Sequence, residues 1–565
     1  MENCESLGIE LILHEQDRPA PSCPHGPTLL FEKACVGGAK GRRFYACSAC
    51  RDRKDCNFFQ WEDEKVSEAR LLAREQENKS KMPTFTHKEY CARLKKFTSL
   101  MLHEKMFCVE CELLLLPEER LAHSSHRLSE VTSVQLRRPS ALLPPLENKK
   151  SNAQYLFTDR SAHFLLETLL RLGFTKVLCV GTPRLHELIM LRNFETKEKP
   201  MKSLLLDIDI RYAQFYGQRE FCHYNMFNHH LFGAKASRDV LQGFLCESEG
   251  ERLVMVADPP FGGLVKPLAN SFSLLSQAWE AQHSNGGSVS EMPMIWIFPY
   301  FFEPRIVECL PSLKMLDYQV DYENHPLYKH GKSGRKQSPV RLFTNICPKD
   351  LVLPKEEGYR FCSLCQRYVW SLNKHCSKCN VCPSKDGREW KHCSICEKCV
   401  KPSWKHCGSC SRCTLPDHPC GSKTDQGCFN CGSLAHKRNS CPQRERTKFG
   451  KKGKTGKKMG AVVKANAIRK SGAERKAKKA VPKLQGPAVL LQSLRMPMCW
   501  PVMVAVLGAV LGACLPALAP GCDVSRNHIC GARVQGDIMI GLMLPSHDSV
   551  QNLNRTSPER YQCSK

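Results

Sequence analysis

Between residues 150 and 347, short apolar runs alternate with stretches of helical period. Five runs predict buried strands, at Val177–Val180, Ser203–Asp207, Glu220–Tyr224, Leu253–Ala257 and Met294–Phe298. Ala162–Leu172 is the clearest helix between them, and the later runs Lys314–Tyr322 and Val340–Asn345 suit an antiparallel closing pair. Because strands alternate with helices, the pattern predicts an α/β fold with a doubly wound sheet of the Rossmann kind.

The fourth of these strands ends in the motif Asp258-Pro259-Pro260-Phe261. Neither proline can donate to a strand ladder, so a carboxylate is held at the carboxyl tip of the strand, where open α/β sheets bind ligands. Asp258 and the carbonyl of Pro259 can accept the two hydrogens of an adenine amine and favour its reactive form. Phe261 can stack on a base that has left its own stack. The alternative is a plain turn, because Asp before Pro commonly starts one.

The length and charge of the chain indicate further domains and a polyanionic partner. The chain has 565 residues, which is too long for one core and suggests three or more units. Its 83 Lys and Arg against 56 acidic residues give a formal charge of +27, which indicates a polyanionic partner, with RNA as the natural candidate. Met1–Gln16 has no sustained apolar core, so it predicts no signal peptide, and the 34 cysteines then indicate zinc rather than disulfides.

Residues 20–62 combine cysteines and a histidine with interleaved arginines and aromatic residues, a pattern that grips single strands. The stretches Gly41-Arg-Arg-Phe-Tyr45 and Phe58-Phe-Gln-Trp61 resemble the GRF zinc finger of nucleic-acid enzymes. The resemblance implies the zinc ligands Cys23, His25, Cys47 and Cys56. Cys35 and Cys50 remain possible replacements for one of them. The aromatic residues can also simply pack the small core of a zinc fold.

Residues 105–130 offer a second candidate zinc site, after a charged helix predicted within Glu62–Lys81. Its ligands would be Cys108, Cys111, His123 and His126. The two histidines are closer together than in most fingers of this kind, so His103 stays a candidate. A helix with exposed histidines is the alternative. Arg137–Pro145, rich in Pro and Leu, is interpreted as a linker.

Residues 360–421 repeat a His-Cys-x2-Cys-x2-Cys pattern. The candidate ligands are Cys362, Cys365, His375, Cys376, Cys379, Cys382, His392, Cys393, Cys396, Cys399, His406, Cys407, Cys410, Cys413, His418 and Cys420. Twelve cysteines and four histidines allow at most four tetrahedral zinc ions, and the sequence does not say which ligands share an ion. The spacing resembles the cysteine-rich domain of DHHC palmitoyltransferases. Those enzymes need several membrane spans that this chain lacks, so we interpret the block as structural zinc.

Cys428, Cys431, His436 and Cys441, within residues 426–443, have the spacing of a CCHC zinc knuckle, which binds single-stranded nucleic acid. Residues 444–485 form a basic tail that should be disordered when free, hold RNA phosphates, and can act as a nuclear or nucleolar address. In residues 486–565, the uncharged run Met496–Ala519 is long enough for a membrane anchor. Three prolines interrupt this run, so we favour an atypical C-terminal tail on a soluble protein.

The domain at residues 150–347 resembles RNA adenine N6-methyltransferases. Asp258–Phe261 matches the Asp/Asn-Pro-Pro-aromatic signature of S-adenosylmethionine-dependent amino methyltransferases, and Gln154–Thr158 resembles the Gln-Tyr-x-Thr motif of the family with one residue inserted. The resemblance implies a class I methyltransferase sheet flanked by small zinc modules. It also implies cofactor contacts from Gln154, Tyr155, Thr158, Gly181, Arg184, Asp207, Asn225, Met226 and Asp258.

Within this cofactor set the roles differ. Gly181 is the one glycine where the family has a glycine-rich loop, and Arg184 offers a contact to the methionine carboxylate. Asp207 would accept the ribose hydroxyls, with Asp209 as the competing choice. Asn225 and Met226 would flank the cofactor's adenine. For each acid, a turn or a helix cap is the alternative.

The order of modules from Cys23 to Lys483 resembles the zinc-finger CCHC-domain-containing rRNA adenosine N6-methyltransferases. This implies a structured stem-loop of large-subunit ribosomal RNA as substrate, free or in a pre-ribosomal particle, and a location in nucleolus, nucleus and cytoplasm. No obligatory protein partner is evident. Two alternatives remain: a glutamine or DNA-adenine methyltransferase with the same motif, and a degenerate methyltransferase that serves as an RNA-binding scaffold.

Overall fold

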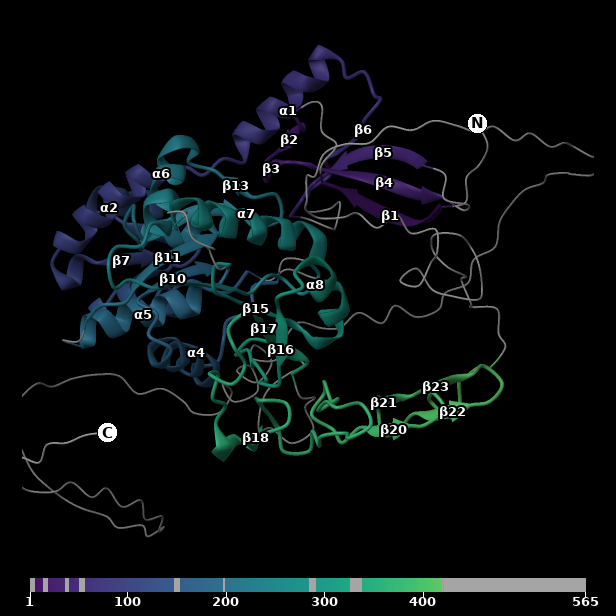
Figure 1. Ribbon diagram of the computed structural model, residues 1–565. Coiled ribbons are helices and arrows are strands. Elements are labelled where there is room, and N and C mark those ends of the chain that lie inside the picture. Colours follow the sequence, from purple (N-terminus) through teal and green to yellow (C-terminus); the bar gives the residue numbers. More distant parts are fainter. Residues whose placement is uncertain are drawn as a thin grey trace, which may run out of the picture. The chain divides into compact units, whose positions relative to one another are not determined.

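The computed structural model describes residues 6–13, 19–35, 40–49, 56–146, 153–196, 199–283, 291–325, 338–418 and 420 (Figure 1). The predicted zinc knuckle, the basic tail and the apolar C-terminal run lie outside the described residues. Within the described part of the chain, no helix is long and apolar enough to cross a membrane.

An eight-stranded mixed sheet forms the centre of the methyltransferase-like domain. Its strand order is β13-β12-β11-β10-β14-β15-β17-β16. In chain order the strands are β10 (Lys176–Val180), β11 (Lys202–Asp207), β12 (Phe221–Asn225), β13 (His230–Leu231), β14 (Leu253–Ala257), β15 (Met294–Pro299), β16 (Lys314–Leu316) and β17 (Val340–Thr344). The strands from β12 to β15 are parallel, and β17 runs antiparallel to both of its neighbours. The five predicted parallel strands and an antiparallel closing pair are confirmed, but the run Lys314–Tyr322 forms a strand only over Lys314–Leu316.

Helices cover both faces of this sheet. They are α4 (Asp159–Arg171), α5 (Pro183–Glu195), α6 (Ala234–Leu245), α7 (Val265–His283) and α8 (Glu303–Cys309). Figure 1 shows α4 and α5 on one side and α6 and α7 on the other. Strand β10 shows why both faces are filled: Val177 and Cys179 pack with α4 and α5, whereas Leu178 and Val180 pack with α6 and α7. Alternate residues of a strand point to opposite faces, so an all-apolar strand needs cover on both.

The segment before this domain contains three small units. The strands β1 (Ser6–Ile12), β4 (Leu29–Cys35), β5 (Lys40–Ala46) and β6 (Phe59–Trp61) form an antiparallel sheet beside the hairpin β2 (Ser22–Cys23) and β3 (Gly26–Pro27). Next come helix α1 (Glu68–Ser80), which has no buried residue, as predicted for a solvated helix, and α2 (His87–Ser99). A three-stranded sheet of β7 (Met106–Cys108), β8 (Leu113–Leu115) and β9 (Leu128–Glu130) follows, with 3₁₀ turns η2 (Leu102–Glu104) and η3 (Pro117–His123).

The stretch Arg137–Pro145 is not the linker that its composition predicted. Helix α3 (Ser133–Arg137) and the 3₁₀ turn η4 (Pro139–Ala141) run into it, and Pro139 and Leu143 are buried. The backbone N–H and the hydroxyl of Ser140 each donate to the Glu187 carboxylate on α5, at 2.9 Å. The prolines and leucines that suggested a linker therefore pack the segment onto the domain.

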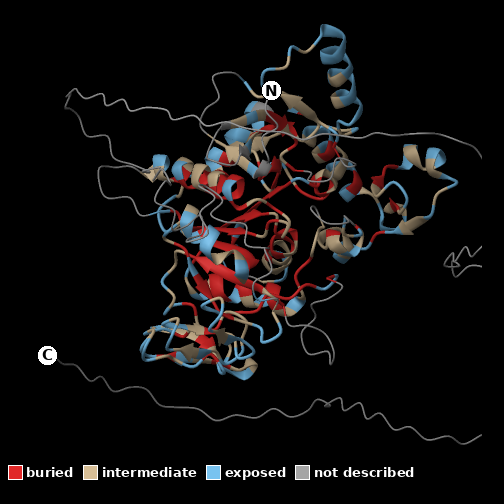
Figure 2. Cartoon of the chain, turned by 90° about the vertical axis from the view of Figure 1, so that its right-hand side faces the viewer, coloured by how far each residue is buried: buried red, intermediate tan, exposed pale blue. Residues whose placement is uncertain are grey.

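After the sheet, the chain forms three successive β-hairpins. They are β18 (Tyr359–Cys362) with β19 (Arg367–Trp370), β20 (Lys391–Cys393) with β21 (Lys398–Val400), and β22 (Lys405–Cys407) with β23 (Arg412–Thr414). The buried apolar cluster specific to this region contains only Cys362, Val369 and Cys382. Figure 2 accordingly shows the sheet domain as buried and the hairpins as mostly intermediate or exposed.

Candidate active site and zinc centres

Asp258 lies directly after β14 at the carboxyl edge of the sheet. Its backbone N–H donates to the carbonyl of Val180 on the neighbouring strand (3.1 Å). Its Oδ1 accepts a hydrogen bond from the hydroxyl of Tyr322 (2.8 Å). Burial raises the pKa of Asp258 well above its usual range, and the bond from Tyr322 opposes this by stabilising the carboxylate.

Four aromatic rings form a cluster that reaches this carboxyl group through Tyr322. Tyr155 lies 4.5 Å from His325 and 5.6 Å from Phe261, measured between ring centroids. Tyr322 lies 5.5 Å from Phe261. Flat, apolar rings beside a hydrogen-bond acceptor suit a planar base with an exocyclic amine.

Tyr322 and His325 were not predicted from the sequence as site residues. They reach the site because the segment around Tyr322 pairs with the Gln-Tyr motif: Thr158 N–H donates to Asp321 (3.1 Å), and Glu323 N–H donates to Leu156 (2.9 Å). Their one sequence signal is their position at and after the end of the run Lys314–Tyr322. The pairing brings Gln154–Thr158 to Asp258 although 100 residues of chain separate Thr158 from it.

Gly181 forms the turn after β10 with a backbone φ of +64°, which favours glycine. A Cβ added there would lie 2.6 Å from the methyl carbon of Met226 and 3.2 Å from the carbonyl oxygen of Asp258. The single glycine of this loop therefore stands where the backbone, Met226 and the Asp-Pro-Pro-Phe motif approach one another closely.

The two competing acids at the end of β11 have different surroundings. Asp209 forms an ion pair with Arg211 (2.6 Å) and accepts from the Gln154 amide (3.3 Å). Asp207 accepts the backbone N–H of Asp209 (2.9 Å). Burial and the nearby Asp209 carboxylate raise the pKa of Asp207 to about 7. Because Asp209 is engaged by a cation, Asp207 is the better candidate for the ribose hydroxyls.

Two other predicted cofactor contacts already have partners within the protein. The guanidinium of Arg184 pairs with Asp159 (2.8 Å) and Glu187 (2.9 Å). The amide of Asn225 donates to the carbonyl of His25 (2.8 Å), in the N-terminal finger. The contacts of these two side chains to a cofactor stay predictions.

The structure brings together the four predicted ligands in the GRF-type finger, which is the N-terminal finger, and also in the second finger at residues 105–130. The first set is Cys23, His25, Cys47 and Cys56, and the second is Cys108, Cys111, His123 and His126. Within each set all ligand atoms lie within 4.8 Å of one another. Zinc bonds of about 2.0 to 2.3 Å put tetrahedral ligands roughly 3.5 Å apart, so both sets fit the ion. His103 lies in η2 and is not in the second set; Cys50 lies outside the described residues.

In the cysteine-rich block, ligands from neighbouring repeats share a site. The sets are Cys362, Cys365, His375 and Cys382; Cys376, Cys379, His392 and Cys399; and Cys393, Cys396, His406 and Cys413. Cys407 lies 3.6 Å from Cys420, and Cys410 lies 3.4 Å from His418, which makes a fourth set. We call Cys362–Cys420 the zinc ladder, because the hairpins β20–β21 and β22–β23 each supply ligands to two successive sites.

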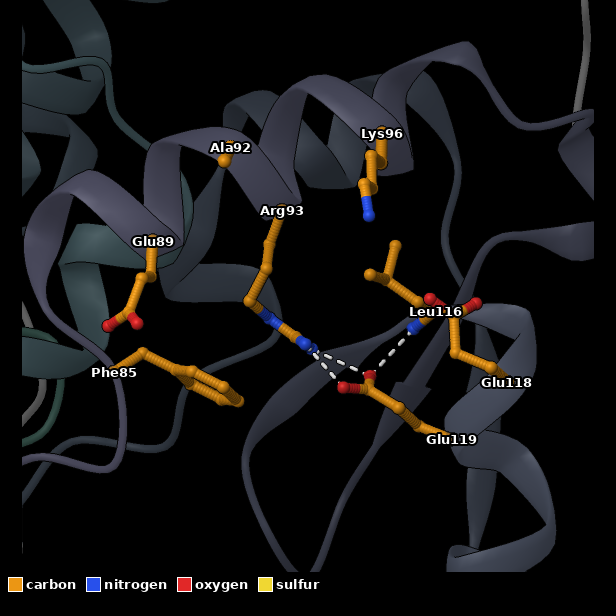
Figure 3. A pocket seen from close by; sticks show the side chains of 8 residues that line it. All are labelled: Phe85, Glu89, Ala92, Arg93, Lys96, Leu116, Glu118 and Glu119. Atoms are coloured by element: carbon orange, nitrogen blue, oxygen red, sulfur yellow. Dashed lines mark hydrogen bonds and ion pairs between the residues drawn. The ribbon is translucent and has the colours of Figure 1, made fainter.

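A surface cavity of about 300 Å³ lies between α2 and η3 (Figure 3). Arg93 stacks over the ring of Phe85 (4.4 Å) and pairs with the carboxylate of Glu119 (2.7 Å). Arg93 and Glu119 of this cavity are thus paired with each other, and none of the predicted catalytic or metal residues lines it.

A sheet of this strand order with Asp-Pro-Pro-Phe at the end of β14 defines an S-adenosylmethionine-dependent methyltransferase. Residues 148–345 match the sequence model of the family described as probable N6-adenine methyltransferase, and residues 21–65 match that of the GRF zinc finger. Together with the cysteine and histidine sets, these matches indicate S-adenosylmethionine and zinc as the cofactors.

Among characterised proteins, the chain is similar to the rRNA N(6)-adenosine-methyltransferase ZCCHC4 of several vertebrates. It is 58% identical to that of Xenopus tropicalis over 80% of this chain and 92% of the relative. It is 60% identical to that of Homo sapiens over 77% of this chain and 85% of the relative. For Bos taurus the identity is 57%, over 82% and 89%. The chain belongs to this family of rRNA N(6)-adenosine-methyltransferases.

Proposed function

We propose that this protein transfers the methyl group of S-adenosylmethionine to N6 of an adenosine in large-subunit ribosomal RNA. The observation that carries the proposal is the carboxyl group of Asp258 at the tip of β14, hydrogen-bonded to Tyr322, whose ring packs with those of Tyr155 and Phe261. Family membership supports the same substrate, since the relatives named above act on adenosine in rRNA.

Each part of the site then has a defined task. A flipped adenine lies against Phe261, and its amine donates to the carboxylate of Asp258 and the carbonyl of Pro259. S-adenosylmethionine supplies the electrophilic methyl group. Asp258 need not be a strong base, because the amine that has accepted a methyl group is cationic and loses its proton easily. The ionised carboxylate is the stronger acceptor, and the hydrogen bond from Tyr322 favours that form.

The zinc modules hold the RNA while the sheet domain does the chemistry. The GRF-type finger presents Arg42 over the ring of Trp61 (4.1 Å), an arrangement suited to stacking with an unpaired base. A stem-loop of rRNA, free or within a pre-ribosomal particle, is the partner that this combination fits, and the site of action is then the nucleolus, with further protein in nucleus and cytoplasm. The knuckle and basic tail, outside the described residues, would add phosphate contacts.

The test supplies the protein with labelled S-adenosylmethionine and total RNA, DNA or a protein extract, followed by digestion to nucleosides. Label is expected as N6-methyladenosine in large rRNA. Asp258→Ala should reduce the rate by a hundredfold or more, as removal of a transition-state acceptor does, while RNA affinity is retained. Label in DNA or protein would show that the protein transfers methyl groups to a substrate other than rRNA.

The scaffold alternative makes the opposite forecast. A protein that binds RNA but transfers no label to any substrate, with zinc loaded, would support it. An Asp258→Ala variant as fast as its parent would overturn the catalytic assignment. Gly181 favours an active methyltransferase over an RNA-binding scaffold. The one glycine of the loop lies at the position whose positive φ favours glycine.

A further inference from the structure

The loop that follows β12, residues 225–228, is held from outside by the N-terminal finger. Asn225 is fully buried, and its amide donates to the carbonyl of His25 (2.8 Å) and to the hydroxyl of Ser48 (2.9 Å). Its Oδ1 accepts the backbone N–H of Phe227 (3.0 Å). Both amide hydrogens of Asn225 are therefore committed to the finger.

Asn228 repeats this contact at the other end of the loop. Its amide donates to the carbonyl of Pro27 (2.7 Å) and to that of His25 (3.2 Å). The His25 carbonyl thus accepts from two asparagines, while the Nδ1 atom of His25 lies 3.5 Å from the sulfur of Cys47 in the zinc set. One residue connects the zinc site to the loop.

The finger and the loop also pack too closely for a larger residue at Gly26. Gly26 has a φ of +90°, and a Cβ added there would lie 2.6 Å from Cδ2 of His230 in β13. Both the conformation and the space therefore require glycine. This fit fixes the finger's hairpin against the strand that follows the loop.

The apolar surroundings are continuous across this contact. Cys23, Cys47 and Cys56 belong to the same buried cluster as Met226 and Phe227. On its other side the loop is limited by Gly181, where an added Cβ would meet the Met226 methyl at 2.6 Å. The loop is consequently clamped between the finger and the turn after β10.

We infer that the N-terminal finger is a wall of the cofactor site: it holds residues 225–228 in the position that receives the adenosine end of S-adenosylmethionine. The inference rests on the proposed function and on the expectation from the sequence resemblance that Asn225 and Met226 flank that adenine. Without the finger the loop would sample other positions. The measured affinity for S-adenosylmethionine is then the intrinsic affinity multiplied by the fraction of molecules whose loop is in the binding-competent position. Asn228, Gly26 and Ser48 are then positioning residues that need not touch the cofactor.

The test is the dissociation constant of S-adenosylmethionine, measured by calorimetry on the full chain without RNA. Asn228→Ala removes two hydrogen bonds to the finger and should raise that constant about tenfold. In rate measurements the KM for S-adenosylmethionine should rise by a similar factor, while kcat at saturating cofactor changes less than twofold. Zinc content should equal that of the parent. Gly26→Ala should have the same effect through steric separation.

Asn78→Ala is the matched control. The Asn78 amide also donates to the finger's hairpin, at the carbonyl of Ser22 (3.3 Å), but from the exposed helix α1 rather than from the loop. Its cofactor affinity should stay within twofold of the parent. If Asn228→Ala and Gly26→Ala both bind S-adenosylmethionine like the parent with zinc loaded, the inference is wrong. If the parent itself binds no S-adenosylmethionine, the proposed function fails instead.

Discussion

The sheet domain and the zinc ladder are stabilised in opposite ways. Every residue of β10 and of β14 is buried, and helices cover both faces. In the ladder, by contrast, Ile395 is 71% exposed and the hairpins have almost no apolar core of their own. Hydrophobic burial can hold the first region, whereas metal ligation must hold the second. The ladder is therefore the part whose fold depends on its ligands rather than on its packing.

The ladder's alternating geometry explains how metal replaces a core. His392 and Cys393 are adjacent in β20, so their side chains point to opposite faces of the hairpin. His392 joins the site of Cys376 and Cys379, while Cys393 joins that of His406. The hairpins β20–β21 and β22–β23 are consequently each held between two ions, so the loss of the ion that they share loosens both.

Zinc removal should separate the two regions most clearly. A strong chelator applied to the full chain should unfold the ladder, because each structural zinc supplies on the order of 10 kcal/mol. Hydrogen exchange followed by mass spectrometry should show full exchange of Lys391–Val400, while β10 and β14 remain protected. Zinc added back should restore protection. If the ladder stays protected with zinc absent by metal analysis, the comparison is wrong.

Truncation of a single core side chain should destabilise the sheet domain and leave the ladder unchanged, the reverse of zinc removal. Leu178→Ala removes a fully buried side chain from β10 and should lower the free energy of unfolding of the sheet domain by about 2 to 5 kcal/mol. Zinc content and exchange in the ladder should not change. Ile395→Ala, the same kind of truncation at an exposed ladder position, should cost at most about 0.5 kcal/mol in denaturant titrations. Equal losses in the two variants would mean that Ile395 is packed against something.

Where the signal was local, the sequence was sufficient. Leu253–Ala257 was predicted as a strand with the bounds that β14 has, because five buried positions in a row before two prolines leave little choice. The bond from Tyr322 to Asp258 spans 64 residues and carries no local pattern. The direction of the Asn225 side chain likewise depends on a finger 200 residues away.

The sharing of zinc ligands in the ladder could be predicted from the sequence in part. The sequence analysis left the pairing open, yet period-two alternation already separates each histidine from the cysteine that follows it. Asp207 and Asp209 show the limit of such arguments. Asp207 is the last residue of β11 and Asp209 lies two positions further on, so alternation does not separate them. The ion pair of Asp209 with Arg211 distinguishes them only in three dimensions.

The smallest predicted effect concerns the backbone of the ladder. In each site of the ladder, the residue that follows the first Cys-x2-Cys pair is a non-glycine residue with positive φ: Gln366, Asn380, Glu397 and Ser411. For a side chain with a Cβ this left-handed conformation costs about 1 kcal/mol, which glycine avoids, although glycine also loses more entropy on folding. Glu397→Gly, at φ +50°, should therefore stabilise the ladder by about 0.5 kcal/mol, seen as slower zinc loss to a chelator. Lys398→Gly, one residue later in β21, has no strain to relieve and should accelerate that loss. If both variants accelerate it, the turn is not strained at Glu397 and the ladder's stability comes from the metal bonds alone.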